Sequence, residues 1–268
     1  MRPWTACLAV TLLAADSGYV ASVEQWRRDR ETELRADDGW LNLTALLWLK
    51  PGPNRLDVGL FDLTPGRVSF RALPSASVTL EGRPVTTMEL RPDVPGPADL
   101  LASGELRFHL IRRGERFGVR IRDLNHPTRR NFPGLSWFPI RETYHVRTRY
   151  TAHPQPKTID IPNVLGDTES RPTPGYVEFT LHGRPCRLEP VRSGDELFFI
   201  FKDLTAGRET YPGGRFLYTP LPRDSVVDLD FNKAYSPPCA FTPYATCPLP
   251  PPQNRLGVRV EAGEQYRH

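Results

Sequence analysis

The chain has 268 residues, enough for one large domain or two small ones with a sizeable core. With 39% hydrophobic and 25% charged residues, its composition is typical of a soluble globular protein. The formal net charge of +4 is spread along the chain without a Lys/Arg-rich block, which argues against a nucleic-acid-binding protein.

The amino terminus has the layout of a secretory signal. Arg2 precedes an apolar run, Ala6 to Ala15, and small residues allow cleavage after Ser17 or Ser22. This run is shorter than the ~20 apolar residues that a transmembrane helix needs, and no later stretch approaches that length, so no integral membrane segment is expected. We therefore assign residues 1–22 to a signal peptide and expect a secreted or periplasmic protein, with a cytoplasmic protein as the alternative.

The next two segments predict a helix and a second element that is either a helix or a strand. Val23 to Arg35 predicts a helix, because it contains several good helix formers and neither Gly nor Pro. Leu41 to Leu49 is apolar and predicts a short helix or a strand, which Pro51 and the following residues end.

From Arg55 onward the pattern is that of a β protein. The 29 prolines and 20 glycines favour many short strands joined by turns. Leu106–Ile111 and Phe117–Arg122 alternate around a Gly-containing turn and predict a hairpin. We expect a mainly β fold with sandwich-like or barrel-like antiparallel sheets and one or two short amino-terminal helices.

A half-buried strand is predicted at Tyr144 to Tyr150, whose alternation sets His145, Arg147 and Arg149 on one face. The prolines at 154 and 156 form the best candidate boundary in a single domain, 23–268. Similar Gly-Arg-Pro turns on either side of it suggest two β sub-halves, residues 55–150 and 157–268.

Residues 201–264 hold an unusual density of Tyr, Asp, Asn, Arg and Cys among glycines and prolines. The segments with the most distinctive sequences are Thr210–Leu217, Leu229–Asn232, Pro237–Ala240 and Cys247–Leu256, together with upstream Trp26–Arg28, Gly39–Leu41, Leu47–Leu49, Phe132–Leu135 and Trp137–Pro139. On these motifs the chain resembles the bacterial family called domain of unknown function 1684, over nearly everything after the first twenty residues. The resemblance implies a single family-wide domain and supplies no activity, substrate or cofactor.

Several standard kinds of active site are disfavoured. There is no Gly-x-Ser-x-Gly elbow, and none of the six histidines lies within residues 201–264. No cysteines and histidines stand at metal-ligand spacing, and no phosphate-binding Gly-rich loop follows a strand. We therefore expect neither a metal nor a cofactor.

What remains is a set of carboxylates, amides and guanidinium groups. If residues 226–231 form a strand, Asp228, Asp230 and Asn232 share one face, because strand side chains alternate. Two acids and an amide suit polar-ligand binding or acid–base work. We take Asp230 as the candidate base, and the candidate ligand-binding residues are Arg215, Asn232, Tyr211, Asp228, Asn254, Arg255 and Glu264. The competing interpretation is structural: the acids pair with Arg215 and Arg255 and fix the loops.

These residues predict a pocket for a small polar or anionic ligand, with hydrolysis as a further option, and leave open whether the protein is an enzyme. The alternative is a structural or protein-interaction module that uses the proline-rich segment Pro238–Pro252. The sequence does not indicate the substrate or the oligomeric state.

Cys239 and Cys247 are predicted to form a disulfide, because the protein is expected to be exported and the loop between them is short. A bridge closing so few residues is worth ~2–3 kcal/mol in the loop-entropy model. Cys186, in a predicted strand, is expected to be a buried free thiol.

Overall fold

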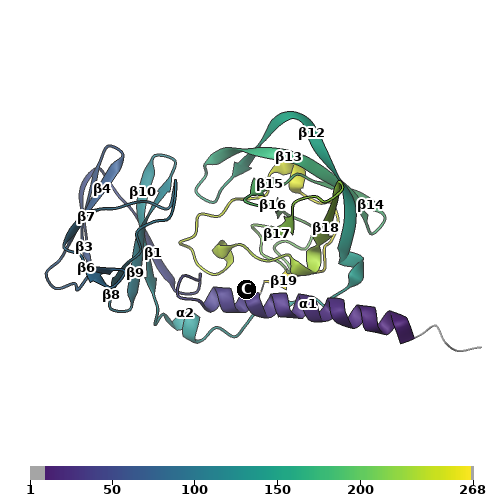
Figure 1. The fold of residues 1–268 in the computed structure, drawn as a ribbon, viewed down its shortest axis with the longest axis horizontal. Coiled ribbons are helices and arrows are strands. Elements are labelled where there is room, and N and C mark those ends of the chain that lie inside the picture. The colour runs from purple at the N-terminus through teal and green to yellow at the C-terminus, as the bar shows by residue number, and fades with distance from the viewer. Residues whose placement is uncertain (1–9, 267–268) are drawn as a thin grey trace, which may run out of the picture. The chain divides into compact units, whose positions relative to one another are not determined.

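The fold is mainly β with antiparallel sheets, which confirms the predicted fold class. The computed structural model describes residues 10–266, with side chains from Ser17 onward (Figure 1). Within that range its α-helices are α1 (Val10–Arg35) and α2 (Pro127–Arg130). None of the helices described is both long and apolar enough to cross a membrane.

The chain divides into two compact units. Unit 1 contains the chain up to Thr32, Gly134–Ala240 and the residues from Thr246 onward, and unit 2 contains Glu33–Pro133 and Phe241–Ala245. The chain therefore changes unit after residues 32, 133, 240 and 245, and none of these positions is the boundary suggested by the prolines at 154 and 156.

Unit 2 consists of two antiparallel sheets around one core. The first, in the order β1-β10-β9-β8-β5-β6, is formed by β1 (Leu43–Trp48), β5 (Thr79–Leu80), β6 (Arg83–Pro84), β8 (Leu101–Ser103), β9 (Leu106–Arg113) and β10 (Arg116–Asp123). The second, in the order β2-β3-β4-β7, is formed by β2 (Gly52–Leu56), β3 (Gly59–Thr64), β4 (Arg67–Ala72) and β7 (Thr87–Glu89). The buried rings of Phe61, Phe70 and Phe108 come from both sheets and contact one another.

The predicted hairpin is confirmed as β9 and β10, which pair antiparallel. Phe108 and Leu110 of β9 and Val119 of β10 are fully buried, so alternate residues of each strand face the core. The segment Leu41–Leu49, for which the sequence allowed a short helix or a strand, forms strand β1.

Unit 1 also combines antiparallel sheets. One has the order β14-β13-β12-β18, a second the order β15-β16-β17, and β11 pairs with β19. Their bounds are β11 (Ser136–Trp137), β12 (His145–Pro162), β13 (Thr168–Leu181), β14 (Arg184–Leu188), β15 (Val191–Ser193), β16 (Glu196–Phe201), β17 (Arg215–Pro220), β18 (Val226–Asp230) and β19 (Glu264–Gln265). The core of this unit includes the fully buried Leu188, Phe199, Phe201, Leu229 and Phe231.

Strand β12 runs without a break through Pro154 and Pro156, which explains why these prolines mark no boundary. The register of β12 against β13 shifts between Ala152 and Lys157. Proline has no N–H to donate, so a bulge is where a long strand tolerates it.

Helix α1 includes the predicted helix but begins at Val10, well before Val23. Short 3₁₀ helices occur only in unit 1 among the described residues: η1 (Glu142–Tyr144), η2 (Phe231–Lys233), η3 (Pro238–Ala240) and η4 (Pro252–Asn254).

The later part of the proline-rich segment is ordered against unit 1. The backbone N–H of Leu249 donates to the Pro162 carbonyl over 2.7 Å, and the Val164 N–H donates to the Cys247 carbonyl over 3.1 Å. Pro250 and Pro251 are buried. The backbone around these prolines is therefore used within the protein.

Candidate functional site

Asp230, the last residue of β18, is held by a polar network that includes helix α1. The hydroxyl of Tyr19 on α1 donates to Asp230 Oδ1 over 2.8 Å. The backbone N–H of Asn232 donates to the same oxygen, and the Asn232 amide donates to the Tyr19 hydroxyl oxygen over 2.9 Å. Lys233 Nζ lies 3.3 Å from Asp230 Oδ2. One carboxylate oxygen is therefore occupied by donors, and the other faces a cation.

The prediction that Asn232 lies on the strand face with Asp230 is wrong, because β18 ends at Asp230 and Asn232 belongs to η2. The two side chains still meet, since Asp230 caps η2 by accepting the Asn232 N–H. Asn232 also fixes a second segment: its amide donates to the Arg141 carbonyl and its oxygen accepts the Arg141 N–H.

His145, the first residue of β12, joins this group from the neighbouring strand. It is the cross-strand partner of Asp230, and its ring stacks on the Tyr19 ring with centroids 5.0 Å apart. His145 Nε2 lies 3.9 Å from Oδ1 of Asp228, whose side chain is 57% exposed. Burial, followed by the bond to Asp230, raises the pKa of Tyr19, so its hydroxyl remains a donor across the physiological pH range.

Arg215 belongs to a different group. This fully buried side chain, at the start of β17, forms an ion pair with Asp203 over 2.7 Å. It also donates to the backbone carbonyls of Val260 and Ala262. The predicted structural role therefore fits Arg215, but its partner is Asp203 and not Asp230.

Glu264 of β19 is near Arg215 but not near enough to hydrogen-bond it. Its carboxylate is 2% exposed and Oε2 lies 3.8 Å from Arg30 Nε of α1. Burial raises the pKa of Glu264 to about 7, against the opposing influence of Arg30, Ser236 and Arg215. Arg30 also stacks on Tyr235 and donates to the Ser236 carbonyl, so this group attaches α1 to unit 1.

Asn254 and Arg255 lie apart from both groups. The Asn254 side chain accepts the Glu189 N–H over 2.8 Å and donates to the carbonyls of Glu189 and Ile200. This satisfies three backbone groups in a buried position, which is a structural function. The Arg255 side chain is exposed.

Tyr211 forms a third group, with its ring edge-on to Tyr266 at 5.1 Å between centroids. Burial raises its pKa to about 12, and the nearby Cys239 and Cys247 add to this effect. The predicted site residues therefore do not form one pocket in unit 1: Asp228, Asp230 and Asn232 are together, whereas Arg215, Glu264, Asn254, Arg255 and Tyr211 lie elsewhere.

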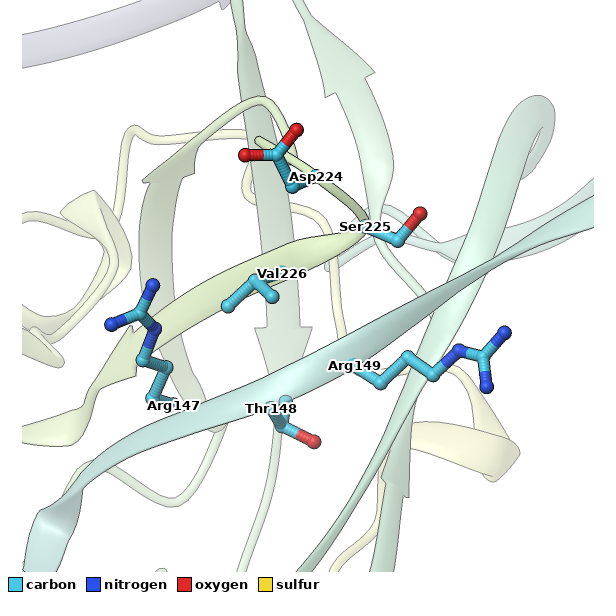
Figure 2. Close-up of a pocket in the computed structure, with 6 residues that line it drawn as sticks. All are labelled: Arg147, Thr148, Arg149, Asp224, Ser225 and Val226. Atoms are coloured by element: carbon cyan, nitrogen blue, oxygen red, sulfur yellow. The ribbon is translucent and has the colours of Figure 1, made fainter.

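Two depressions, of about 580 and 430 Å³, share Arg147 and Val226 as lining residues, and Asp228 lines the smaller one. The larger is lined by Arg147, Thr148 and Arg149 of β12, Asp224 and Ser225 of a tight turn, and Val226 of β18. The smaller is lined by Arg147, Pro220, Leu221, Arg223, Val226, Val227 and Asp228. Figure 2 shows the side chains of Arg147 and Arg149 extending on opposite sides of Val226.

The turn next to these depressions explains their shape. Asp224 and Ser225 both have positive φ, 51° and 59°, and connect the bridged residues Arg223 and Val226. Such a two-residue turn matches the twist of paired strands and brings Arg223 back beside β18. The lining of the two depressions therefore combines polar side chains with those of Pro220, Leu221, Val226 and Val227.

The sequence predicts Asp228 as a site residue, but not Tyr19, Arg147 or Arg223. Alternation had set His145 and Arg147 on one strand face, and that face is the one next to Asp228. No sequence pattern marks Tyr19 as a site residue, since it lies within residues 1–22, which were assigned to a signal peptide. Its contact with Asn232 joins residues 213 positions apart, which no local pattern predicts.

A family model described as "Protein of unknown function (DUF1684)" matches residues 130–265. An uncharacterised protein of Haloarcula marismortui, solved by NMR, is 35% identical over 52% of this chain and 80% of its own, with a TM-score of 0.44. A search of the curated proteins gave no match.

Proposed function

Because the chain belongs to the DUF1684 family, whose function is unknown, its own residues must indicate its role, and we propose that it binds a small anionic ligand. The proposed site is the pair of depressions along the paired strands β12 and β18, which we call the arginine face: Arg147, Arg149, Arg223 and Asp228 with the apolar lining residues Pro220, Leu221, Val226 and Val227.

The observation that carries the proposal is the unpaired positive charge of this face. Arg147, Arg149 and Arg223 are exposed, and within residues 10–266 none of them forms an ion pair with a carboxylate. Other arginines of unit 1 do have such partners, as Arg187 and Arg215 show. Guanidinium groups that keep their donors available suit carboxylate or phosphate oxygens, which accept two parallel hydrogen bonds.

A hydrolytic reaction on this face would need a base, and His145 is better suited to that role than Asp230. Asp230 is occupied by Tyr19 and Asn232, whereas His145 is 37% exposed and lies next to Asp228. A carboxylate beside an imidazole orients the ring. Asp230 would then act indirectly, by holding the Tyr19 ring that stacks on His145.

The rival role, a module that binds partners through its proline-rich segment, has less support. The backbone and several prolines of that segment are already engaged within unit 1. Export to the periplasm or beyond remains a separate proposal that rests on the amino-terminal sequence pattern.

The test is stabilisation by inorganic phosphate, measured as the shift in melting temperature at constant ionic strength. A phosphate concentration ten times the Kd should stabilise the wild type by about 1.4 kcal/mol. We expect Arg147→Ala and Arg223→Ala each to weaken the shift and the double variant to abolish it.

Arg192→Ala is the matched control, because it removes an exposed arginine of unit 1 from β15 and should leave the shift unchanged. Chloride at the same ionic strength should give no shift, since screening alone does not depend on the anion's shape. A shift of equal size in the double variant would contradict the proposal. Chromogenic phosphate and carboxylate esters, tested with wild type and His145→Ala, would then show whether binding leads to hydrolysis.

A further inference from the structure

Cys239 and Cys247 lie close together at the two ends of a short excursion of the chain. Both belong to unit 1, whereas Phe241–Ala245 between them belongs to unit 2. The backbone N–H of Cys239 donates to Cys247 Sγ over 3.1 Å. The structure contains cysteines here, not a disulfide, so the sulfur of Cys247 is already adjacent to the residue with which it would pair.

Two glycines allow close approach of the segments that lie beside this pair of cysteines. A Cβ on Gly213 would meet the Tyr211 ring at 2.5 Å, and one on Gly214 would meet Pro250 at 2.5 Å. Gly214 also has a φ of 95°, which side-chain-bearing residues rarely adopt. These glycines therefore let Tyr211 and the segment after Cys247 approach closely, which puts the Tyr211 hydroxyl in the electrostatic range of both thiols.

The two cysteines differ in access and in environment. Cys239 is half-buried, and Cys247 is 4% exposed. A backbone N–H directed at Cys247 Sγ favours the thiolate that Cys247 needs in order to attack the sulfur of Cys239. This asymmetry suits a pair in which one sulfur meets an external reagent and the other completes the bond.

We propose that Cys239 and Cys247 form a thiol–disulfide exchange site whose co-substrate is a low-molecular-weight disulfide such as glutathione disulfide. The Cys239 thiolate attacks one sulfur of that disulfide, forming a mixed disulfide and releasing one thiolate. The Cys247 thiolate then attacks the Cys239 sulfur and releases the second thiolate. Two protein thiols become one disulfide, and the external disulfide is reduced to two thiols.

Oxidation at this site would close a ring around Phe241–Ala245. In unit 2 this segment is anchored by the Thr242 hydroxyl, which donates to the Leu43 carbonyl over 3.1 Å, and by Phe241, whose ring is edge-on to Phe132. A Cys239–Cys247 disulfide would therefore link the two ends of a segment that Phe241 and Thr242 already attach to unit 2. This site is separate from the arginine face, and its failure would leave the proposed function standing.

The experiment uses the full chain in buffers with a graded ratio of reduced to oxidised glutathione. Samples are quenched with acid, alkylated, digested with trypsin and analysed by mass spectrometry. Cys239 and Cys247 fall in one tryptic peptide, Ala234–Arg255, which contains no other cysteine. We expect this peptide to lose both alkyl groups together as the buffer becomes more oxidising, and to regain them on reduction.

Variants assign the order of the steps. Cys247→Ser should accumulate glutathione on Cys239, whereas Cys239→Ser should react far more slowly, because only the buried sulfur remains. Cys186→Ser is the control and should leave the transition unchanged, since Cys186 is buried in β14 and its thiol donates to the Arg184 carbonyl. Full alkylation of both cysteines in the most oxidising buffer would overturn the proposal. So would glutathione retained on wild-type Cys239, or a disulfide to any other cysteine.

Discussion

Buried acids in unit 1 differ in how they are compensated, and that difference decides what each can do. Asp203 has a full guanidinium partner in Arg215, with atoms 2.7 Å apart. Asp230 is held mainly by neutral donors, and Glu264 has its guanidinium neighbour at 3.8 Å. Asp203 is part of a structural ion pair. For Asp230 we expect stability to depend on its side chain, and for Glu264 we expect stability to depend on pH.

Removing the Asp230 side chain should destabilise the protein by about 2 kcal/mol, because the Tyr19 O–H and the backbone N–H of Asn232 lose their acceptor. Urea denaturation of Asp230→Ala at pH 7 measures this loss. Asp228→Ala is the control: its side chain is 57% exposed, so the free energy of unfolding should change by no more than about 0.5 kcal/mol. An unchanged stability in Asp230→Ala would show that the network contributes nothing.

Glu264 should make stability depend on pH between about 4.5 and 7. Its pKa is raised from 4.5 in the unfolded chain to about 7 in the folded one, so the folded state binds a proton that the unfolded state releases. Stability from this group is therefore full below pH 4.5 and is lost as the pH rises through 7, by about 3 kcal/mol in all.

We expect Glu264→Gln to remove this dependence, so that its free energy of unfolding gains on the wild type as the pH rises. Urea denaturation from pH 4.5 to 8 measures the difference between the two proteins. Glu261→Gln is the control, because Glu261 is only half-buried and pairs with Arg259 over 2.9 Å. Parallel curves for Glu264→Gln and wild type would contradict the assignment.

At the scale of elements, α1 is attached to unit 1 along one side by several kinds of contact. Trp26 meets Trp137 edge-on, Arg27 donates to the Phe138 carbonyl, and Glu31 accepts the Leu135 N–H. Tyr19 extends this attachment by two turns toward the amino terminus. The residues on either side of Ser22 are therefore in one docked helix.

For an exported protein, this docking favours one of the two cleavage positions that the sequence predicts. Cleavage after Ser22 would remove Tyr19 and leave Asp230 and Asn232 without it, whereas cleavage after Ser17 would keep the network. We expect exported protein to begin at Gly18. Amino-terminal sequencing of the protein from producing cells measures this, with a start at Val23 contradicting the docking argument and an intact Met1 contradicting export.

How far elements could be predicted depended on whether the pattern was local. Alternation was sufficient for β9 and β10, because their partners are adjacent in sequence. The prolines at 154 and 156 suggested a boundary, yet β12 continues through them, since a bulge tolerates residues that lack an N–H. The start of α1 was missed because its first residues read as a signal peptide.

At the scale of the molecule, composition was enough to predict a mainly β fold but not its division into units. Phe241–Ala245 leaves the surrounding chain to join unit 2, and nothing in its composition marks that change. Whether Arg215 and Asp230 lie in one site also depends on tertiary contacts, which composition does not show. Arg215 paired instead with Asp203, a residue whose sequence context gave no sign of burial. Charge pairing could be expected from the sequence, but the choice of partner could not.

The long separations in the α1 contacts have a consequence for synthesis. Arg30 and the Ser236 carbonyl that it contacts are 206 residues apart. At typical translation rates, ~10–40 s pass between the emergence of Arg30 and that of Ser236. The Phe138 carbonyl that accepts from Arg27 emerges about halfway through that interval, so the docking surface of α1 is completed in stages. The attachment of α1 is thus completed only after most of unit 1 has been synthesised, although the helix itself precedes that unit's strands in the chain.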